Sequence, residues 1–138
     1  MDITKLGTVS EDEGVLVHLR DVNEEPMFDE QQQPITLRVA GTYSSFYREA
    51  QRKETARSIR ATQRRGAAKA VSDADVEELE DASVRVQAAC IREWCFQSGG
   101  KPFPITAQNW RTLLDMQPQW QAQVHAAMQE HADFFKRS

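Results

Sequence analysis

The C-terminal third of the chain, residues 91–135, reads IREWCFQSGGKPFPITAQNWRTLLDMQPQWQAQVHAAMQEHADFF. This stretch contains all three tryptophans and four of the six phenylalanines of the 138-residue chain. Its apolar residues recur at helical spacing, and glycine or proline stands at each break. Neither this stretch nor the rest of the chain contains a catalytic or ligand-binding motif, so the aromatic residues favour a binding protein over an enzyme.

Three helices are predicted around these aromatic residues. Ser72 is a suitable N-cap for the first helix, whose apolar residues continue at steps of four and three as far as Trp94. The sequence SGGKPFP then breaks the pattern. Thr106 caps a short second helix that carries Trp110, and Pro118 suits the first turn of a last helix.

The N-terminal part of the chain predicts two strands. In GVLVHLR (14–20) and PITLRVA (34–40) every second residue is apolar, which is the period of a strand. The connection between them is too long for a two-residue turn, so an antiparallel pair with an open acidic loop is expected. Because two strands alone are marginal, helices or another subunit must cover their apolar face.

Between the strands and the aromatic third, a helix over about 45–65 is predicted, capped by Ser44 or Ser45. Its second half has little apolar surface to bury. The expected fold is α+β, with a small N-terminal antiparallel β-hairpin (14–40) followed by about four helices (44–135). We expect a single domain over 1–138, with residues 1–12 flexible and no internal repeat.

The net charge of −4 conceals a strong segregation of charge along the chain. Residues 48–69 carry eight basic and two acidic side chains, whereas residues 73–81 carry six acidic ones. Arg57, Arg60 and Arg64 lie on one face of the predicted helix and could contact nucleic-acid phosphates. The alternative is a solvated helix whose charge is balanced by the acidic segment. This alternative is favoured, since no aromatic residues interleave with the arginines and the whole protein is acidic.

Other sites are not indicated by the sequence. If Cys90 and Cys95 share a helix, they lie ~7.5 Å apart along its axis and ~140° around it, too far for a disulfide, and both are expected to be buried. The histidines lack metal-ligand spacing, so neither a metal nor a cofactor is expected. No apolar run approaches the ~20 residues of a membrane helix, and Asp2 follows Met1, which predicts a cytoplasmic protein that is not in a membrane.

The aromatic third itself has two interpretations. Its large side chains can simply form the core, with about 1.5–3 kcal/mol of stabilisation for each one buried. Alternatively, part of it forms a groove or patch that receives an apolar segment of a partner. Because three tryptophans are rarely all buried in a small domain, a partly exposed aromatic edge near 94–103 is expected. The candidate partner-binding residues are Trp94, Phe96, Phe103, Trp110 and Trp120.

The order of these parts resembles the tail assembly chaperones of long-tailed bacteriophages. The matching pieces, within residues 14–52 and 91–135, are GVLVHLRD, ITLRVAGTYSSFYREAQRK, IREWCFQSGGKPFPITAQNWRTLL and QPQWQAQVHAAMQEHADFF. In that family a strand pair is followed by an aromatic entry to a charged helix, then by a tryptophan-bearing helix, a G-K-P-x-P turn and two further helices. The Arg-rich segment 53–72 is longer than in the family, and nothing is carried over to it.

The resemblance implies a non-enzymatic assembly factor in the cytoplasm of a host bacterium. Such proteins bind the tape measure protein and keep it soluble while the tail tube forms around it, and they are absent from the finished particle. The resemblance also implies possible contact with the major tail protein, self-association, and a longer form made by ribosomal frameshifting. The alternatives from the residues themselves are a nucleic-acid-binding accessory protein acting through 48–69 and a structural head–tail component.

Overall fold

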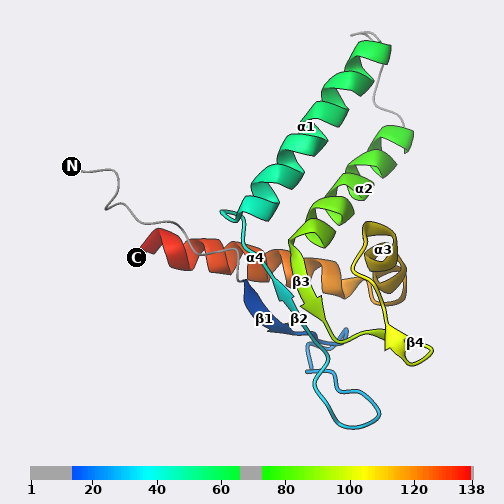
Figure 1. The fold of residues 1–138 in the computed structure, drawn as a ribbon, viewed down its shortest axis with the longest axis vertical. Helices are drawn as coiled ribbons and strands as arrows, with labels where there is room; N and C mark the ends of the chain where they lie inside the picture. The colour runs from blue at the N-terminus through cyan, green and yellow to red at the C-terminus, as the bar shows by residue number, and fades with distance from the viewer. Residues whose placement is uncertain (1–13, 66–72, 138) are drawn as a thin grey trace.

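The computed structural model describes residues 14–65 and 73–137, with side chains for 14–63 and 77–130, as an α+β fold. Three strands form one antiparallel sheet and two further short strands form a hairpin; α3 and α4 lie beside the sheet, whereas α1 and α2 extend away from it (Figure 1). In chain order the elements are β1 (Val15–His18), β2 (Thr36–Val39), α1 (Ser45–Arg65), α2 (Asp73–Cys90), β3 (Ile91–Trp94), β4 (Gln97–Ser98), β5 (Lys101–Pro102), α3 (Ala107–Met116) and α4 (Gln119–Arg137). No helix in the described ranges is both long and apolar enough to cross a bilayer.

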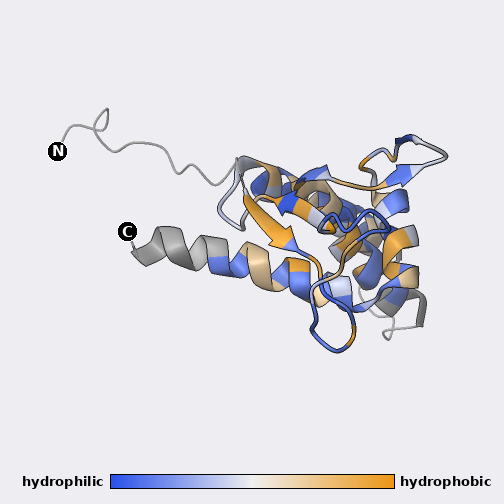
Figure 2. Cartoon of the chain, turned by 90° about the horizontal axis from the view of Figure 1, so that it is seen from below, coloured by the Kyte–Doolittle hydropathy of each residue, from blue (hydrophilic) through white to orange (hydrophobic). Residues whose placement is uncertain are grey.

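The predicted strand pair is confirmed. Strands β1 and β2 run antiparallel, with Val15 opposite Val39 and Val17 opposite Leu37. These four residues point to the covered face of the sheet, whereas Leu16 on the other face is exposed. The hydrophobic strands lie beside α4, so a helix supplies the cover that two strands require (Figure 2).

The prediction that the helix after Ser72 continues to Trp94 is wrong. Helix α2 ends at Cys90, and the next four residues form β3, which pairs antiparallel with β2. The register shifts between Arg38 and Val39, so Ile91 pairs with Val39 and Trp94 with Leu37. This bulge brings both side chains to the covered face although they are three residues apart. A spacing of three resembles a helix, so the sequence pattern was misleading here.

The connection between β1 and β2 is not an open loop. Three backbone hydrogen bonds connect this segment, with N···O distances of 2.9–3.0 Å. The amide of Met27 donates to the carbonyl of Leu19, the amide of Ile35 donates to the carbonyl of Met27, and the amide of Leu19 donates to the carbonyl of Ile35. These three bonds close a ring, from which the β1–β2 pair and two short hairpins extend. We call this ring, Leu19, Met27 and Ile35, the β junction. It satisfies backbone groups that an open loop would leave to water.

The two short hairpins are built in the same way, which corrects the expectation of no internal repeat. Asp21 and Asp29 each accept backbone N–H bonds from the residues two and four positions later, at 2.8–3.1 Å. In each hairpin the third residue after the aspartate, Glu24 or Gln32, has a φ near +60°. The sequence therefore contains an eight-residue repeat, with an aspartate followed five positions later by proline.

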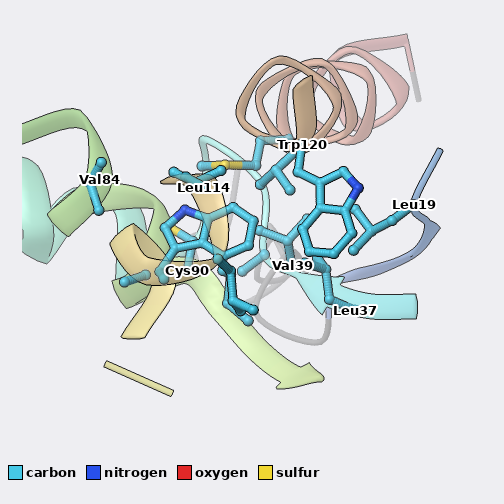
Figure 3. Close-up of a cluster of buried hydrophobic side chains, with 14 residues drawn as sticks. Leu19, Leu37, Val39, Val84, Cys90, Leu114 and Trp120 are labelled. Carbon is cyan, nitrogen blue, oxygen red and sulfur yellow. The ribbon is translucent and has the colours of Figure 1, made fainter. Parts of the chain in front are cut away.

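Helices α3 and α4 form the core with the sheet and the C-terminal half of α2 (Figure 3). Thr106 caps α3 as predicted, because its side chain accepts the amide of Asn109 at 3.1 Å. Helix α4 begins at Gln119, one residue after Pro118. The fourteen buried residues of this core are Leu19, Leu37, Val39, Ala40, Val84, Ala88, Cys90, Ile91, Trp110, Leu113, Leu114, Trp120, Val124 and Met128.

Helices α1 and α2 lie side by side and extend away from the sheet (Figure 1). We call this pair the arm. Ser44 caps α1, as expected for one of the two candidate serines, by accepting the amide of Tyr47 at 3.1 Å. Beyond Ala50, no apolar side chain is buried among residues 51–63 of α1 or 77–83 of α2. These two segments are the distal half of the arm, and they confirm that the second half of α1 buries little.

Candidate aromatic binding surface

The fold brings all five candidate partner-binding residues into one aromatic cluster. Trp94 lies at its centre, with ring centroids 5.4 Å from Phe96, 5.9 Å from Phe103 and 6.2 Å from Trp110. Phe96 stacks in turn on Trp120, at 5.4 Å and an interplanar angle of 26°. These separations lie in the range in which aromatic pairs attract one another beyond simple burial. The residues therefore form a continuous chain of rings.

The short β4–β5 hairpin positions Phe96 and Phe103 within this cluster. Its two turn residues, Gly99 and Gly100, both have positive φ values, 60° and 78°. A two-residue turn of this kind is easily formed only by residues that tolerate left-handed backbone. The amide of Phe103 donates to the carbonyl of Phe96 at 3.1 Å, which extends the hairpin by one pair. The glycine pair is therefore a turn, as predicted.

All three indole N–H groups in the cluster have acceptors. Trp94 donates to the carbonyl of Phe103 at 2.6 Å, and Trp110 donates to the side-chain oxygen of Gln87 at 3.0 Å. Gln87 is only 4% exposed, and its amide donates in turn to the carbonyl of Gln121. Buried polar groups are costly unless they are paired, so these bonds fix the orientation of the rings. The helical spacing of the sequence gave no signal for this role of Gln87.

A second anchor joins α4 to the β junction. The carbonyl of Arg20 accepts from the indole of Trp120 at 3.2 Å and from the side chain of Gln123 at 3.0 Å. The oxygen of Gln123 also accepts the amide of Arg20 at 2.8 Å. Gln119 adds a longer bond to the same carbonyl. The first two turns of α4 are therefore fixed to the chain beside β1.

Burial divides the cluster into an interior and an edge. Trp110 and Trp120 are 0% and 4% exposed, so they belong to the core. Trp94, Phe96 and Phe103 are half-buried and pack against that core from outside. We call these three residues the aromatic edge. It offers apolar and π surface that can hold an apolar side chain.

The two cysteines do not share a helix. Cys90 ends α2 and is fully buried, whereas Cys95 follows β3 and is exposed, and both are free thiols. The expectation of burial is therefore wrong for Cys95. Burial raises the pKa of Cys90 to about 12, although a hydrogen bond with Ser44 opposes the shift. Cys90 consequently acts as an apolar side chain of the core.

The candidate basic face lies on α1 in the arm. Arg57 and Arg60 are exposed, and the side chain of Arg64 lies outside the described residues. Neither Arg57 nor Arg60 forms an ion pair with a side chain of residues 14–63 or 77–130.

The ion pair that joins α1 to α2 has the opposite polarity to the one expected from the net charges. Arg85 of the acidic helix α2 contacts Glu54 of the basic helix α1 at 2.6 Å, and it also contacts Glu78 of its own helix at 2.8 Å. The side chains of Arg85 and Glu54 are 23% and 15% exposed, so solvent screens them only in part. The bond from Arg85 lowers the pKa of Glu54, against a smaller opposing effect of burial.

A shallow cleft of about 220 Å³ lies over this ion pair, between the two helices of the arm. Its walls combine the apolar residues Phe46 and Ala50 with the charged pair Glu54 and Arg85. Across residues 14–63 and 77–130, three or more histidine, cysteine, aspartate or glutamate side chains never gather as metal ligands would.

Comparison with known proteins gives no relative. The chain matches no protein-family model, and neither the curated proteins nor the solved structures contain a match.

Proposed function

We propose that this protein is a tail assembly chaperone of a long-tailed bacteriophage, which binds the tape measure protein and keeps it soluble during tail tube assembly. The proposal rests on the order of sequence pieces described above and on the presence of an aromatic edge suited to an apolar partner. In this proposal the protein acts in the bacterial cytoplasm by binding alone, with neither cofactor nor catalysis.

The observation that carries the proposal is the half-buried state of Trp94, Phe96 and Phe103. A helical client with an apolar stripe presents side chains at every third or fourth position, and such side chains dock into hydrophobic surfaces. The buried rings of Trp110 and Trp120 hold the aromatic edge from behind. A preorganised surface binds with a smaller loss of side-chain entropy than a mobile one.

A long client also explains why one small edge is sufficient. Many copies can bind along one tape measure protein. If neighbouring copies also interact with one another, each copy needs only a weak contact with the client. The abundant charge on the rest of the chain, with 38 charged side chains among 138 residues, keeps such a complex in solution.

Co-expression with a tape measure protein, the long helical client that the proposal expects to be encoded beside this chain, tests the proposal. The expected result is that the client moves from the insoluble to the soluble fraction and co-purifies with this protein. Phe103→Ser should abolish the rescue, since it removes a ring from the aromatic edge while leaving the backbone carbonyl that Trp94 needs.

Phe28→Ser is the matched control, because Phe28 is 52% exposed and lies outside the aromatic cluster. Thermal unfolding of both variants establishes that each one folds. Equal solubility of the client with and without this protein would contradict the proposal. Loss of rescue in Phe28→Ser but not in Phe103→Ser would mean that the client binds beside the β junction and not at the aromatic edge.

Two further observations separate this proposal from its alternatives. The coding DNA should contain a slippery heptanucleotide near its 3′ end, followed by an overlapping frame and a very long helical gene. The protein should also be absent from purified phage particles, whereas a structural head–tail component would remain in them.

A second candidate is a nucleic-acid-binding accessory protein, favoured by the exposed Arg57 and Arg60 on α1. Its binding would fall steeply with added salt, because phosphate contacts release counterions. Replacement of Arg57, Arg60 and Arg64 by glutamate should then abolish binding. The absence of binding to any nucleic acid at low salt would eliminate this candidate.

A further inference from the structure

The aromatic face of the β4–β5 hairpin continues past the aromatic edge to a charged side chain. Phe103 donates its amide to the carbonyl of Phe96, and two positions nearer the tip Ser98 lies opposite Lys101. Side chains alternate between the two faces of a strand, so Ser98 and Lys101 share the face on which Phe96 and Phe103 lie. Lys101 therefore extends the surface of the aromatic edge toward the tip of the hairpin.

Lys101 supplies the charge of this hairpin, and the described residues give it no carboxylate. No other charged side chain occurs in the sequence between 95 and 104. Lys101 is exposed and forms no ion pair with any side chain that the structure describes. Glu93, the nearest acid along the chain, pairs with Arg38 of β2 instead. A carboxylate on a bound partner would complement this ammonium group.

The tip of the hairpin stands clear of the body, which leaves room for a partner beside Lys101. A β-carbon placed at Gly99 or Gly100 would meet no heavy atom within 4 Å in the described part of the chain, apart from the adjoining residues. Figure 1 shows β4 at the margin of the fold, beyond the sheet. The rings are thus braced by the body, whereas the ammonium group projects beyond it.

We propose that the aromatic edge and Lys101 together select client helices in which a carboxylate lies one helical turn from an apolar side chain. This inference rests on the proposed function and names the chemistry of the client. From Phe103 to Lys101 a strand advances about 6.6 Å. Positions i and i+4 of a helix lie on one face, about 6 Å apart along the axis. The spacing of ring and ammonium group therefore matches the spacing of an apolar and an acidic residue on the client.

The two parts of this surface have different roles. The rings hold an apolar side chain whatever residue stands on the next turn of the client. Lys101 distinguishes glutamate from glutamine or lysine on that turn, because charge complementarity contributes to specificity more than to affinity. An exposed ion pair changes affinity by about two- to five-fold. Lys101 is thus a specificity-determining residue beside the apolar contact.

Three synthetic helical peptides test this selection. Each is rich in alanine and carries two leucines one turn apart, and they differ in the residue four positions after the second leucine, which is glutamate, glutamine or lysine. NMR titration of isotope-labelled protein measures each Kd and identifies the amides that respond. The glutamate peptide should bind about two- to five-fold more tightly than the glutamine peptide, and the lysine peptide most weakly. The shifts should centre on residues 94–103.

Two substitutions at Lys101 separate charge from packing. Lys101→Met removes the charge and keeps an unbranched stem, so it should bind the glutamate and glutamine peptides equally. Lys101→Glu should reverse the order, so that the lysine peptide binds most tightly. Lys53→Met is the matched control, because Lys53 is an exposed lysine of the arm, and its loss should leave the preference unchanged. Circular dichroism confirms that each variant keeps its secondary structure.

Three results would overturn the inference: equal binding of the glutamate and glutamine peptides by the wild type, a preference that persists in Lys101→Met, or no response of the amides in 94–103. Client solubility separates this failure from failure of the proposed function. If the wild type and Lys101→Met rescue the client equally and the peptide preference is absent, the inference alone fails. If the wild type rescues no client, the proposed function fails.

Discussion

The body and the arm of this molecule are held together by different forces. The body, formed by the sheet, α3 and α4, surrounds a core that also takes in the C-terminal half of α2. In the distal half of the arm no apolar side chain of residues 51–63 or 77–83 is buried, and Arg85 of α2 joins the helices through Glu54 of α1. Hydrophobic burial does not titrate, whereas ion pairs depend on pH and salt. The arm should therefore open under conditions that leave the body folded.

The largest expected difference between the two regions is in the cost of removing a side chain. Trp110→Ala should lower the free energy of unfolding by about 3–5 kcal/mol, because Trp110 is fully buried in the core. Ile59→Ala should change it by no more than about 0.5 kcal/mol, since Ile59 is exposed in the isolated chain. Urea denaturation at low protein concentration, where copies do not associate, measures both.

Similar losses in the two variants would contradict the distinction between body and arm.

A smaller effect is expected at the buried amide of Gln87. Gln87→Leu replaces the amide by an apolar side chain of similar size and leaves the indole N–H of Trp110 and the carbonyl of Gln121 without their partner. The expected loss is about 2 kcal/mol, at the middle of the range for unpaired buried groups. Chemical denaturation measures it, with Gln97→Leu on the exposed strand β4 as control. A loss no larger than that of the control would show that water replaces Gln87.

The ion pair between Arg85 and Glu54 predicts that the stability of the arm, unlike that of the body, depends on pH. The folded state lowers the pKa of Glu54 below its ordinary value of 4.5. Stabilisation by this carboxylate is therefore complete above that value and is lost as the pH falls through the folded-state pKa. Glu54→Gln should cost about 1–2 kcal/mol at neutral pH, and the cost should diminish in acid.

Hydrogen exchange of the amides in residues 51–63 should detect this change in the arm, while exchange in β2 and α3 stays the same. Glu49→Gln is the matched control, since Glu49 is largely exposed and pairs with Lys53 one turn away at 3.6 Å. A cost of Glu54→Gln that does not change with pH would mean that packing, not charge, joins the helices.

Sequence reasoning succeeded where one element alone determines the pattern. The alternation of Val15 and Val17 predicted β1, and the serine and threonine caps located the starts of α1 and α3. It failed where pairing with a distant segment decides the conformation. Residues 91–94 match a helix by spacing but become a strand because β2 offers an edge, with a bulge that the sequence does not reveal.

The candidate site was predicted in part. The five aromatic residues could be selected from composition, and the fold brings them together, but their hydrogen-bond partners were not apparent. Gln87 and Arg20 act through a side chain and a carbonyl that meet the indoles only in the folded chain. The repeat of aspartate and proline at 21–34 was visible in the sequence, and its period of eight would have indicated two equal turns.

The smallest expected effect comes from substitutions in these two turns, which should stabilise the body and leave the arm unchanged. Glu24 and Gln32 have φ values of 63° and 62°, which suit glycine better than any residue with a β-carbon. Relief of this strain exceeds the entropy cost of glycine, so Glu24→Gly and Gln32→Gly should each raise the free energy of unfolding by about 0.5–1 kcal/mol. Because the turns are separate, the two increments should add.

Gln31→Gly is the control with an opposite expected sign, since Gln31 has no positive φ. Chemical denaturation measures the increments, and unchanged hydrogen exchange in residues 51–63 would show that a more stable body leaves the opening of the arm as it was. Destabilisation by Glu24→Gly to the same extent as Gln31→Gly would mean that the carboxylate contributes more to this turn than its backbone strain costs.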